Sequence, residues 1–250
     1  MTFANAGLAL ILACLAQAVP HPERRTNAPR YNVLITDKYD DLGRTQPVFV
    51  PGATQTYITS DGGVAYNNMI LATQPDPLIA GIQTQSPPNS AVFLQVGGKT
   101  TSAATTGLCF QPKKIYFGCE VMSAEAVAAV QIPCILTLTG HNNILDRDVG
   151  SQSVKFAPSG AVSPMAPADI DPRKIGPSSV VRFETQLDLG ALELGALTSI
   201  LSQLGLSNIA DATLVTLLDN FSYVQYGEED YKNCGLDYKH RSGRNRLSRG

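Results

Sequence analysis

The segment 140–148, Gly-His-Asn-Asn-Ile-Leu-Asp-Arg-Asp, holds the densest set of reactive side chains in the chain. It follows a β-type run, and loops at strand ends often carry function. His141 can act there as a general base, with Asp146 or Asp148 orienting its ring. A polar turn without a catalytic task is the interpretation we favour, because no second histidine and no Gly-x-Ser-x-Gly nucleophile motif accompanies it.

Four carboxylates in or beside β-type runs suggest a second kind of chemistry. They are Glu120, Glu184, Asp188 and Asp219. A glycoside hydrolase would need two of them roughly 5–10 Å apart across a substrate. The sequence does not say which two meet, so this hypothesis stays open.

Asp219 and Asn220 form a pair whose orientation matters. Asp219 alternates with Leu217 and Phe221, so it either faces the core with a hydrogen-bonding partner or lies on an external face. Asn220 begins the only glycosylation sequon, Asn-Phe-Ser. Neighbouring strand residues point to opposite faces, so a glycan on Asn220 requires an inward Asp219.

The elements that must position these groups are short strands. The chain is 44% apolar and 16% charged, with 21 Gly and 16 Pro in 250 residues, which is typical of strands joined by turns. Ten β-type runs appear, at 31–36, 47–50, 54–59, 64–71, 91–96, 114–121, 134–139, 153–156, 179–187 and 212–226. We therefore predict an all-β fold, an antiparallel two-sheet sandwich, with a barrel as the alternative.

One segment has a helical period instead. Apolar residues recur from Leu189 to Leu204, with Asp188 placed to cap the start and Gly205 to end the helix. We predict one amphipathic helix near 189–204 that lies across the sandwich and packs on its core. The proline-rich stretch 157–177 is predicted to be a long surface loop within a single domain, 31–238.

The amino end has the features of an export signal. An apolar run from Gly7 to Ala16 precedes Ala16-Gln17-Ala18, which predicts a signal peptide over 1–18. A short leader, 19–30, contains the dibasic pair Arg24-Arg25, and no second run of membrane length follows. We expect a secreted, extracellular protein whose basic tail, 239–250, is disordered.

Export would leave four cysteines, which an oxidising environment pairs into two disulfides. Cys119 shares its strand face with Ile115 and Phe117, and Cys134 shares its own with Leu136 and Leu138. Both sulfurs should point into the core, which predicts Cys119–Cys134 and, by elimination, Cys109–Cys234. No cysteine pair has zinc-ligand spacing.

Three blocks resemble the signatures of a large group of proteins secreted by filamentous fungi. These blocks are 115–119 (Ile-Tyr-Phe-Gly-Cys), 133–140 (Pro-Cys-Ile-Leu-Thr-Leu-Thr-Gly) and 218–223 (Leu-Asp-Asn-Phe-Ser-Tyr), and the early Asp40-Asp41-Leu42 is similar as well. The likeness spans about 31–226. It implies a galactose-binding-like jelly-roll sandwich, and most members of the group have no assigned activity.

The resemblance also bears on ligands. Glycans or cell-wall material are the expected partner, and because the chain has no tryptophan, Tyr57, Tyr66 and Tyr116 would be the rings that stack on sugars. Such sandwiches often hold a structural calcium near their chain ends, with Asp41 and Asp219 as plausible ligands here, although a hydrogen bond from Asp219 to a neighbouring loop is the favoured alternative. No other cofactor is expected.

Together these patterns predict a secreted, non-catalytic binding or surface-associated protein. The alternatives are an extracellular enzyme, built on the carboxylates or on the His141 loop, and a secreted effector that binds a host protein. A net charge of −2 and the lack of a basic-aromatic cluster argue against a nucleic-acid partner.

Overall fold

The computed structural model describes residues 32–43, 56–73, 81–95, 101–105, 109–122, 129–143, 145–160, 162–192, 194–208 and 212–227. The predicted signal peptide, leader, basic tail and Cys234 lie outside these ranges.

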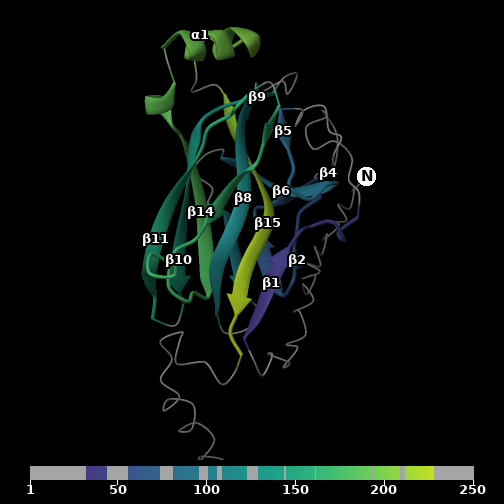
Figure 1. Ribbon diagram of the computed structural model, residues 1–250, viewed down its shortest axis with the longest axis vertical. Coiled ribbons are helices and arrows are strands. Elements are labelled where there is room, and N and C mark those ends of the chain that lie inside the picture. The colour runs from purple at the N-terminus through teal and green to yellow at the C-terminus, as the bar shows by residue number, and fades with distance from the viewer. Residues whose placement is uncertain are drawn as a thin grey trace, which may run out of the picture.

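Two antiparallel sheets face each other (Figure 1), which confirms the predicted all-β two-sheet sandwich. Sheet A has the order β13 (Ala166–Asp169), β8 (Phe110–Met122), β15 (Thr213–Gln225), β6 (Asn89–Gln95) and β4 (Ile70–Thr73), with β1 (Val33–Asp37) paired to β15 and β9 (Ala129–Gln131) paired to β8. Sheet B has the order β11 (Arg147–Phe156), β10 (Cys134–Asn142), β14 (Val180–Leu187), β7 (Thr101–Thr105), β3 (Val64–Asn67) and β2 (Ser60–Asp61). A short parallel pair joins β5 (Ile82–Gln83) to β12 (Ser163–Pro164).

A disulfide links the two sheets across the core. Cys119 of β8 and Cys134 of β10 are bonded, with their Cα atoms 6.2 Å apart, so the bond joins sheet A to sheet B and confirms the pairing predicted from alternation. Close to it, the Thr216 hydroxyl donates to Thr185 across the same gap, at 2.9 Å. Cys109 is also disulfide-bonded, and its predicted partner lies outside the described residues.

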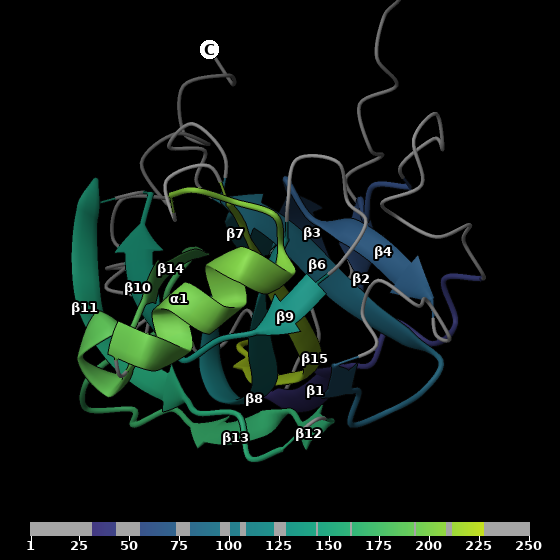
Figure 2. The same cartoon turned by 90° about the horizontal axis from the view of Figure 1, so that it is seen from above.

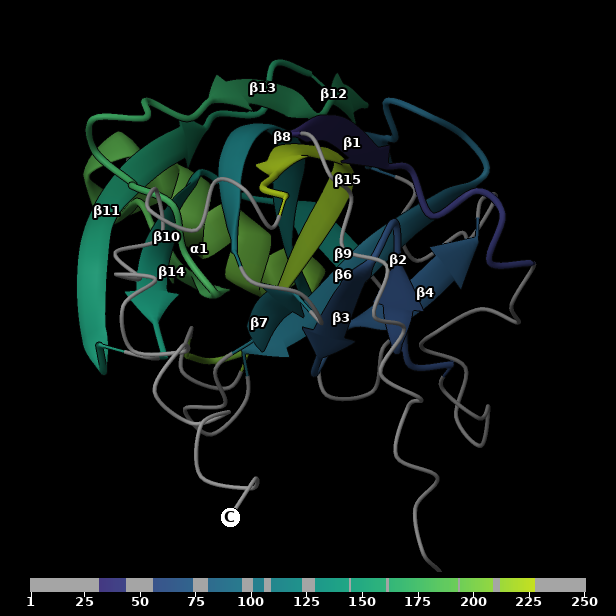
Figure 3. The same cartoon turned by 90° about the horizontal axis from the view of Figure 1, so that it is seen from below.

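A third layer covers the outer face of sheet A. It consists of residues 81–88, which include β5, and of β12; Figures 2 and 3 place β12, next to the edge strand β13, on the side of the molecule away from β7 and β3. Ile82 packs over Gly118 so closely that a Cβ on this glycine would lie 2.7 Å from the Ile82 side chain. The stretch predicted as a surface loop thus contains β12 and β13 and buries Met165 and Ile170. That prediction was wrong because β13 extends sheet A beside β8, and β12 pairs with β5 in the covering layer.

The helical segment differs from its prediction in start and in place. A 3₁₀ turn, η2 (Leu189–Ala191), precedes α1 (Leu194–Gln203), and Asp188 makes no cap hydrogen bond there because its carboxylate pairs with Lys155. Gly205, with φ +65°, ends the helix as predicted. Figures 1 and 2 show α1 over one end of the sandwich rather than across a face, and no helix among the described residues is long and apolar enough to span a membrane.

Candidate functional site

The outer face of sheet B carries a row of polar side chains that crosses five strands. Strand register places one residue from each strand side by side: Ser151, Thr139, Arg182, Ser102 and Asn67. We call this set the polar row. All five side chains are exposed or half-buried, and on four of the strands a neighbouring residue on the opposite face is buried in the core: Leu138, Phe183, Ala103 and Tyr66. Because adjacent strands lie about 4.8 Å apart, the row is about 19 Å long.

A second row runs beside the first on three of the same strands, two residues further along each. Glu184 of β14 lies opposite Thr137 of β10, and Thr137 lies opposite Ser153 of β11. The Thr137 and Ser153 hydroxyls are hydrogen-bonded at 2.9 Å, and Glu184 is exposed. Gln186 follows two residues after Glu184 on the same face. The face therefore presents guanidinium, carboxylate, amide and hydroxyl groups at regular spacing.

The predicted cluster around His141 lies at the end of this face, where β10 connects to β11. The structure brings its members together: His141 Nδ1 lies 2.9 Å from Asp148 Oδ1, and His141 Nε2 lies 3.7 Å from Asp146 Oδ1. Asp148 Oδ1 also lies 3.4 Å from Arg182 Nη1. Both ring nitrogens face carboxylates, which fits a role in holding the β10–β11 connection better than proton transfer to a substrate. Asp148 thus contacts Arg182 of the polar row.

The four carboxylates do not form a hydrolase pair. Glu184 lies on the outer face of sheet B, whereas Glu120 and Asp219 lie on sheet A. Asp219 is paired with Tyr116, four residues before Glu120 on the neighbouring strand, a separation of about 13 Å along the sheet. Asp188 is bonded to Lys155 at 2.8 Å. Sheet membership separates Glu184 from Glu120 and Asp219, and distance along sheet A separates Glu120 from Asp219, so the paired-carboxylate hypothesis finds no support among these three residues.

A buried cluster that the sequence did not reveal lies at the edge of the sandwich. Asp37 of β1 is 1% exposed and accepts hydrogen bonds from the hydroxyls of Tyr66 in sheet B and Tyr223 in sheet A, the latter at 3.1 Å. The Tyr39 hydroxyl donates in turn to Tyr66 at 3.4 Å. Burial raises the pKa of Asp37 to about 7, against the opposing effect of the Tyr66 hydrogen bond. This arrangement fastens β1 to both sheets.

Asp219 is buried as well, but not in the way alternation suggested. Its Oδ2 accepts the Ser86 backbone N–H at 2.7 Å, so it points into the layer that covers sheet A. Asn220, at φ +46°, interrupts the register, and Phe221 instead packs against Phe183 of sheet B. Burial raises the pKa of Asp219 to about 7. The prediction that Asp219 and Phe221 share a face was wrong because of this bulge.

The acidic residues near Asp219 bear on the predicted calcium. Asp40, not Asp41, lies beside Asp219: its carboxylate accepts from the Ser86 hydroxyl at 2.6 Å and from the Asn89 backbone N–H at 3.3 Å. Asp41 is exposed. Within the described residues no three His, Cys, Asp or Glu side chains come together as metal ligands. The favoured alternative, a hydrogen bond from a neighbouring loop to Asp219, is what the structure contains.

Asn220 is half-buried, with its amide oxygen inside the protein. Its backbone N–H donates to Asp219 Oδ1 at 2.7 Å, so the sequon lies on the bulge itself. Glycosylation of Asn220 stays a prediction.

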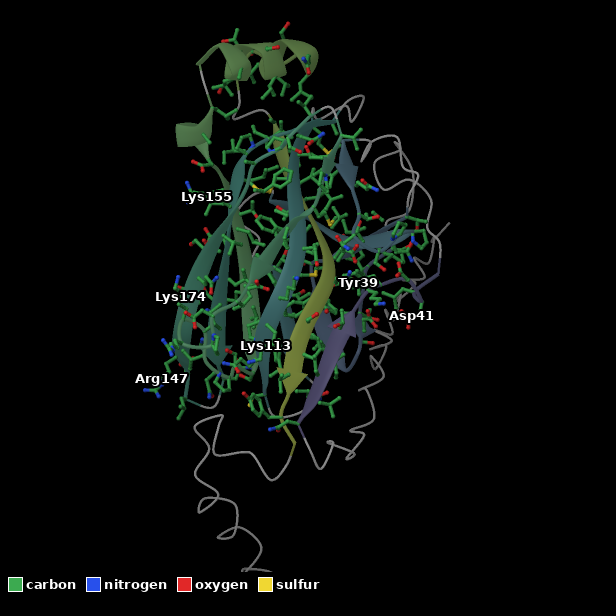
Figure 4. All side chains as sticks on the ribbon, viewed as in Figure 1. Tyr39, Asp41, Lys113, Arg147, Lys155 and Lys174 are labelled. Atoms are coloured by element: carbon green, nitrogen blue, oxygen red, sulfur yellow. A yellow bond between two sulfur atoms is a disulfide. The ribbon has the colours of Figure 1, made fainter. Side chains whose placement is uncertain are left out.

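The three predicted tyrosines do not form a platform. Tyr66 is 7% exposed and bonded to Asp37, so its proposed stacking role was wrong. Tyr116 is half-buried on sheet A, and Lys114 Nζ lies 5.0 Å over its ring. Tyr57 is 58% exposed beside β4. Figure 4 shows Tyr39 and Asp41 on the opposite side of the molecule from Arg147 and Lys155 of β11.

Comparison with known proteins yields only distant likenesses. No protein-family model matches the sequence, and no curated protein does. A DUF4465 family protein from Bacteroides caccae is similar at TM-score 0.47 and 10% identity, over 77% of this chain and 99% of that one. A family 29 carbohydrate-binding module is similar at TM-score 0.31 and 9% identity, over 83% of this chain and 98% of that one. At these values neither assigns a family or a ligand to this chain.

Proposed function

We propose that this protein is a non-catalytic carbohydrate-binding sandwich that holds a neutral glycan chain across the outer face of sheet B. The observation that carries the proposal is the polar row, in which five side chains capable of hydrogen bonding lie side by side on an open sheet face. Its length, about 19 Å, suits a short oligosaccharide rather than a single sugar.

The chemistry of the row favours hydroxyl-rich ligands. A guanidinium donates to two neighbouring hydroxyls, a carboxylate accepts from two, and Ser, Thr and Asn side chains do both. Arg182 contacts Asp148, and Glu184 extends the same strand face. With no exposed aromatic residue among the described residues of this face, recognition would depend on hydrogen bonds, and affinity would be modest.

The same composition argues against the protein-binding alternative. Interfaces between proteins usually centre on buried aromatic or aliphatic anchors. The larger exposed apolar residues of the described chain are scattered instead, and none belongs to the polar row: they are Val33, Leu34, Tyr57, Leu145, Val162 and Leu189. We also propose that the protein acts outside the cell, which the Cys119–Cys134 disulfide supports because such bonds persist in oxidising compartments.

The proposal is tested by measuring binding of the purified chain to cellulose, mannan, starch and chitin, by depletion and by calorimetry. The double variant Arg182→Ala/Glu184→Ala should lose at least about tenfold in affinity for the preferred polysaccharide. Thr36→Ala, an exposed change on β1 of sheet A, is the matched control and should bind as the parent does. Equal binding by the double variant, or no binding of the parent to any glycan, would overturn the proposal.

The proposed export has its own test. Amino-terminal sequencing of protein recovered from the culture medium should begin after Ala18. Protein retained inside the cell with residues 1–18 uncut would contradict it.

A further inference from the structure

A cavity of about 470 Å³ opens at the β9 edge of sheet A. Its walls come from Gly81 of the covering layer, Gln131 of β9, Gly160 and the last residue of α1, Gln203. Figure 2 shows α1 lying above β9 at this end of the sandwich. The volume is in the range of pockets that hold small molecules.

On one wall of the cavity, the absence of a side chain at Gly81 lets two polar side chains approach the backbone. A Cβ on Gly81 would lie 2.7 Å from Gln131 Cγ, 2.9 Å from Gln131 Nε2 and 3.0 Å from Glu120 Oε1. Only glycine leaves room for that amide and that carboxylate to lie side by side against the backbone. Glu120 is 1% exposed, so its carboxylate lies behind the two lining residues Gly81 and Gln131.

The neighbouring disulfide fixes this wall. Cys119 directly precedes Glu120, and its carbonyl accepts the backbone N–H of Ile132 at 3.1 Å. Glu120 is paired with Gln131 in the β8–β9 register, and Cys134 lies three residues beyond Gln131. The β8–β9 segment that forms this wall is therefore held at both ends. Its polar groups are pre-organised, so binding a ligand would need little rearrangement.

The chemistry of the cavity selects a neutral, hydrogen-bonding ligand. Two side-chain amides and the backbones of two glycines line it, next to small apolar surfaces from Ala129 and Val130. No charged side chain is among the described residues that line it. Amides both donate and accept, as sugar hydroxyls do, and the small apolar surfaces can contact the C–H face of a sugar ring.

We propose that this cavity binds a single sugar unit or a polyol of similar size. The site is separate from the polar row, because it lies at the β9 edge of sheet A and shares none of its residues. The inference goes beyond the proposed function and does not rest on it.

Gly160 provides a sharp test because a side chain can be added there without strain. The nearest atom to a Cβ at this position is Val162 O, at 3.9 Å. Because Gly160 lines the cavity, Gly160→Phe should occupy part of it and leave the fold intact. Gly195, which has nothing within 4 Å of its Cβ position and does not line the cavity, allows the matched control Gly195→Phe.

The experiment is calorimetry or NMR titration of the full chain with glucose, mannose, galactose and N-acetylglucosamine at millimolar concentrations. The parent and Gly195→Phe should bind at least one of these sugars, Gly160→Phe should bind it at least about tenfold more weakly, and Gln203→Ala should be weakened to a smaller degree. Equal affinity of Gly160→Phe and the parent, or no binding of any sugar by the parent, would overturn the inference.

The two sites are told apart by crossing their variants. Gly160→Phe should still bind the polysaccharide that the polar row prefers, and Arg182→Ala/Glu184→Ala should still bind the monosaccharide. If Arg182→Ala/Glu184→Ala abolished monosaccharide binding while Gly160→Phe did not, the sugar would lie on sheet B and the cavity assignment would be wrong.

Discussion

Two carboxylates of sheet A and two of sheet B have opposite surroundings. Asp37 and Asp219, both on strands of sheet A, are at most 1% exposed, whereas Asp148 and Glu184 on sheet B are exposed. The difference comes from what surrounds each group. Asp37 lies against Tyr66 of sheet B and Tyr223 of sheet A, the segment 81–88 covers Asp219, and no described segment covers the polar row.

The two buried acids stabilise the fold, whereas the two exposed acids remain available to a ligand. Tyrosine hydroxyls surround the buried Asp37, and backbone N–H groups surround the buried Asp219. Removing such a group leaves its partners without an acceptor, so these acids are coupled to stability. An exposed acid such as Glu184 is hydrated, and its loss costs the fold little.

The largest expected effect is on the pH dependence of stability. Burial raises the pKa of Asp37 from 3.8 to about 7, so folding favours the protonated form. The stabilisation is complete below the unfolded pKa, near pH 4, and is lost as the pH rises through 7, by up to about 4 kcal/mol. Urea unfolding at a series of pH values should show the free energy of unfolding falling between pH 4 and pH 8.

The variant Asp37→Asn should reduce that fall by about half, since an amide does not titrate whereas Asp219, whose pKa burial also raises to about 7, still does. Glu184→Gln, an equally conservative change on the exposed face, is the control and should follow the parent curve. A fall of the same size in Asp37→Asn would mean that another group carries the pH dependence, and the contrast between the two sheets would lose its main support.

A smaller effect is expected from Asp219→Ala. The change leaves the backbone N–H groups of Ser86 and Asn220 without their carboxylate acceptor, which should cost about 3 kcal/mol. Thermal and urea unfolding would measure it, with Glu184→Ala as the partner variant expected within about 0.5 kcal/mol of the parent. Comparable losses in the two variants would show that the covering layer does not distinguish the sheets.

Alternation in the sequence was enough to place some of these groups. The period that put Cys134 on the inner face with Leu136 and Leu138 also puts Thr137 and Thr139 outward, which is where the structure has them. In the same way, Val64 and Tyr66 lie two residues apart on β3 and therefore share a face. The apolar Val64 was thus a signal that Tyr66 points inward.

Other features of the structure could not be predicted from the alternation of residues along a strand. Alternation reports which face a residue is on, but not whether a distant segment covers that face, so the burial of Asp219 beneath residues 81–88 was not predictable. The bulge at Asn220 shifted the register within one strand. The strand β7, Thr-Ser-Ala-Ala-Thr, lacks the large apolar residues that mark a strand, and the structure forms it through pairing with β14 and β3.

The covering layer itself can be perturbed at Gly118. In Gly118→Ala the new methyl group would lie 2.7 Å from the Ile82 side chain, which is itself 1% exposed. Displacing Ile82 should cost about 1–3 kcal/mol of unfolding free energy and raise hydrogen exchange in residues 81–88. Thr139→Ala, on the open face of sheet B, adds no contact and should change neither quantity. Unchanged exchange in Gly118→Ala would mean that Ile82 does not hold the layer down.

The smallest effect on stability is expected where the effect on binding is greatest. Arg182 is 43% exposed along its side chain, and its pair with Asp148 is a surface contact at 3.4 Å. Such pairs contribute little, so Arg182→Ala should unfold within about 0.5 kcal/mol of the parent. If glycan affinity falls at the same time, the face is dispensable for folding and used for recognition. A loss of several kcal/mol would instead assign Arg182 to the scaffold, and the two sheets would no longer differ in kind.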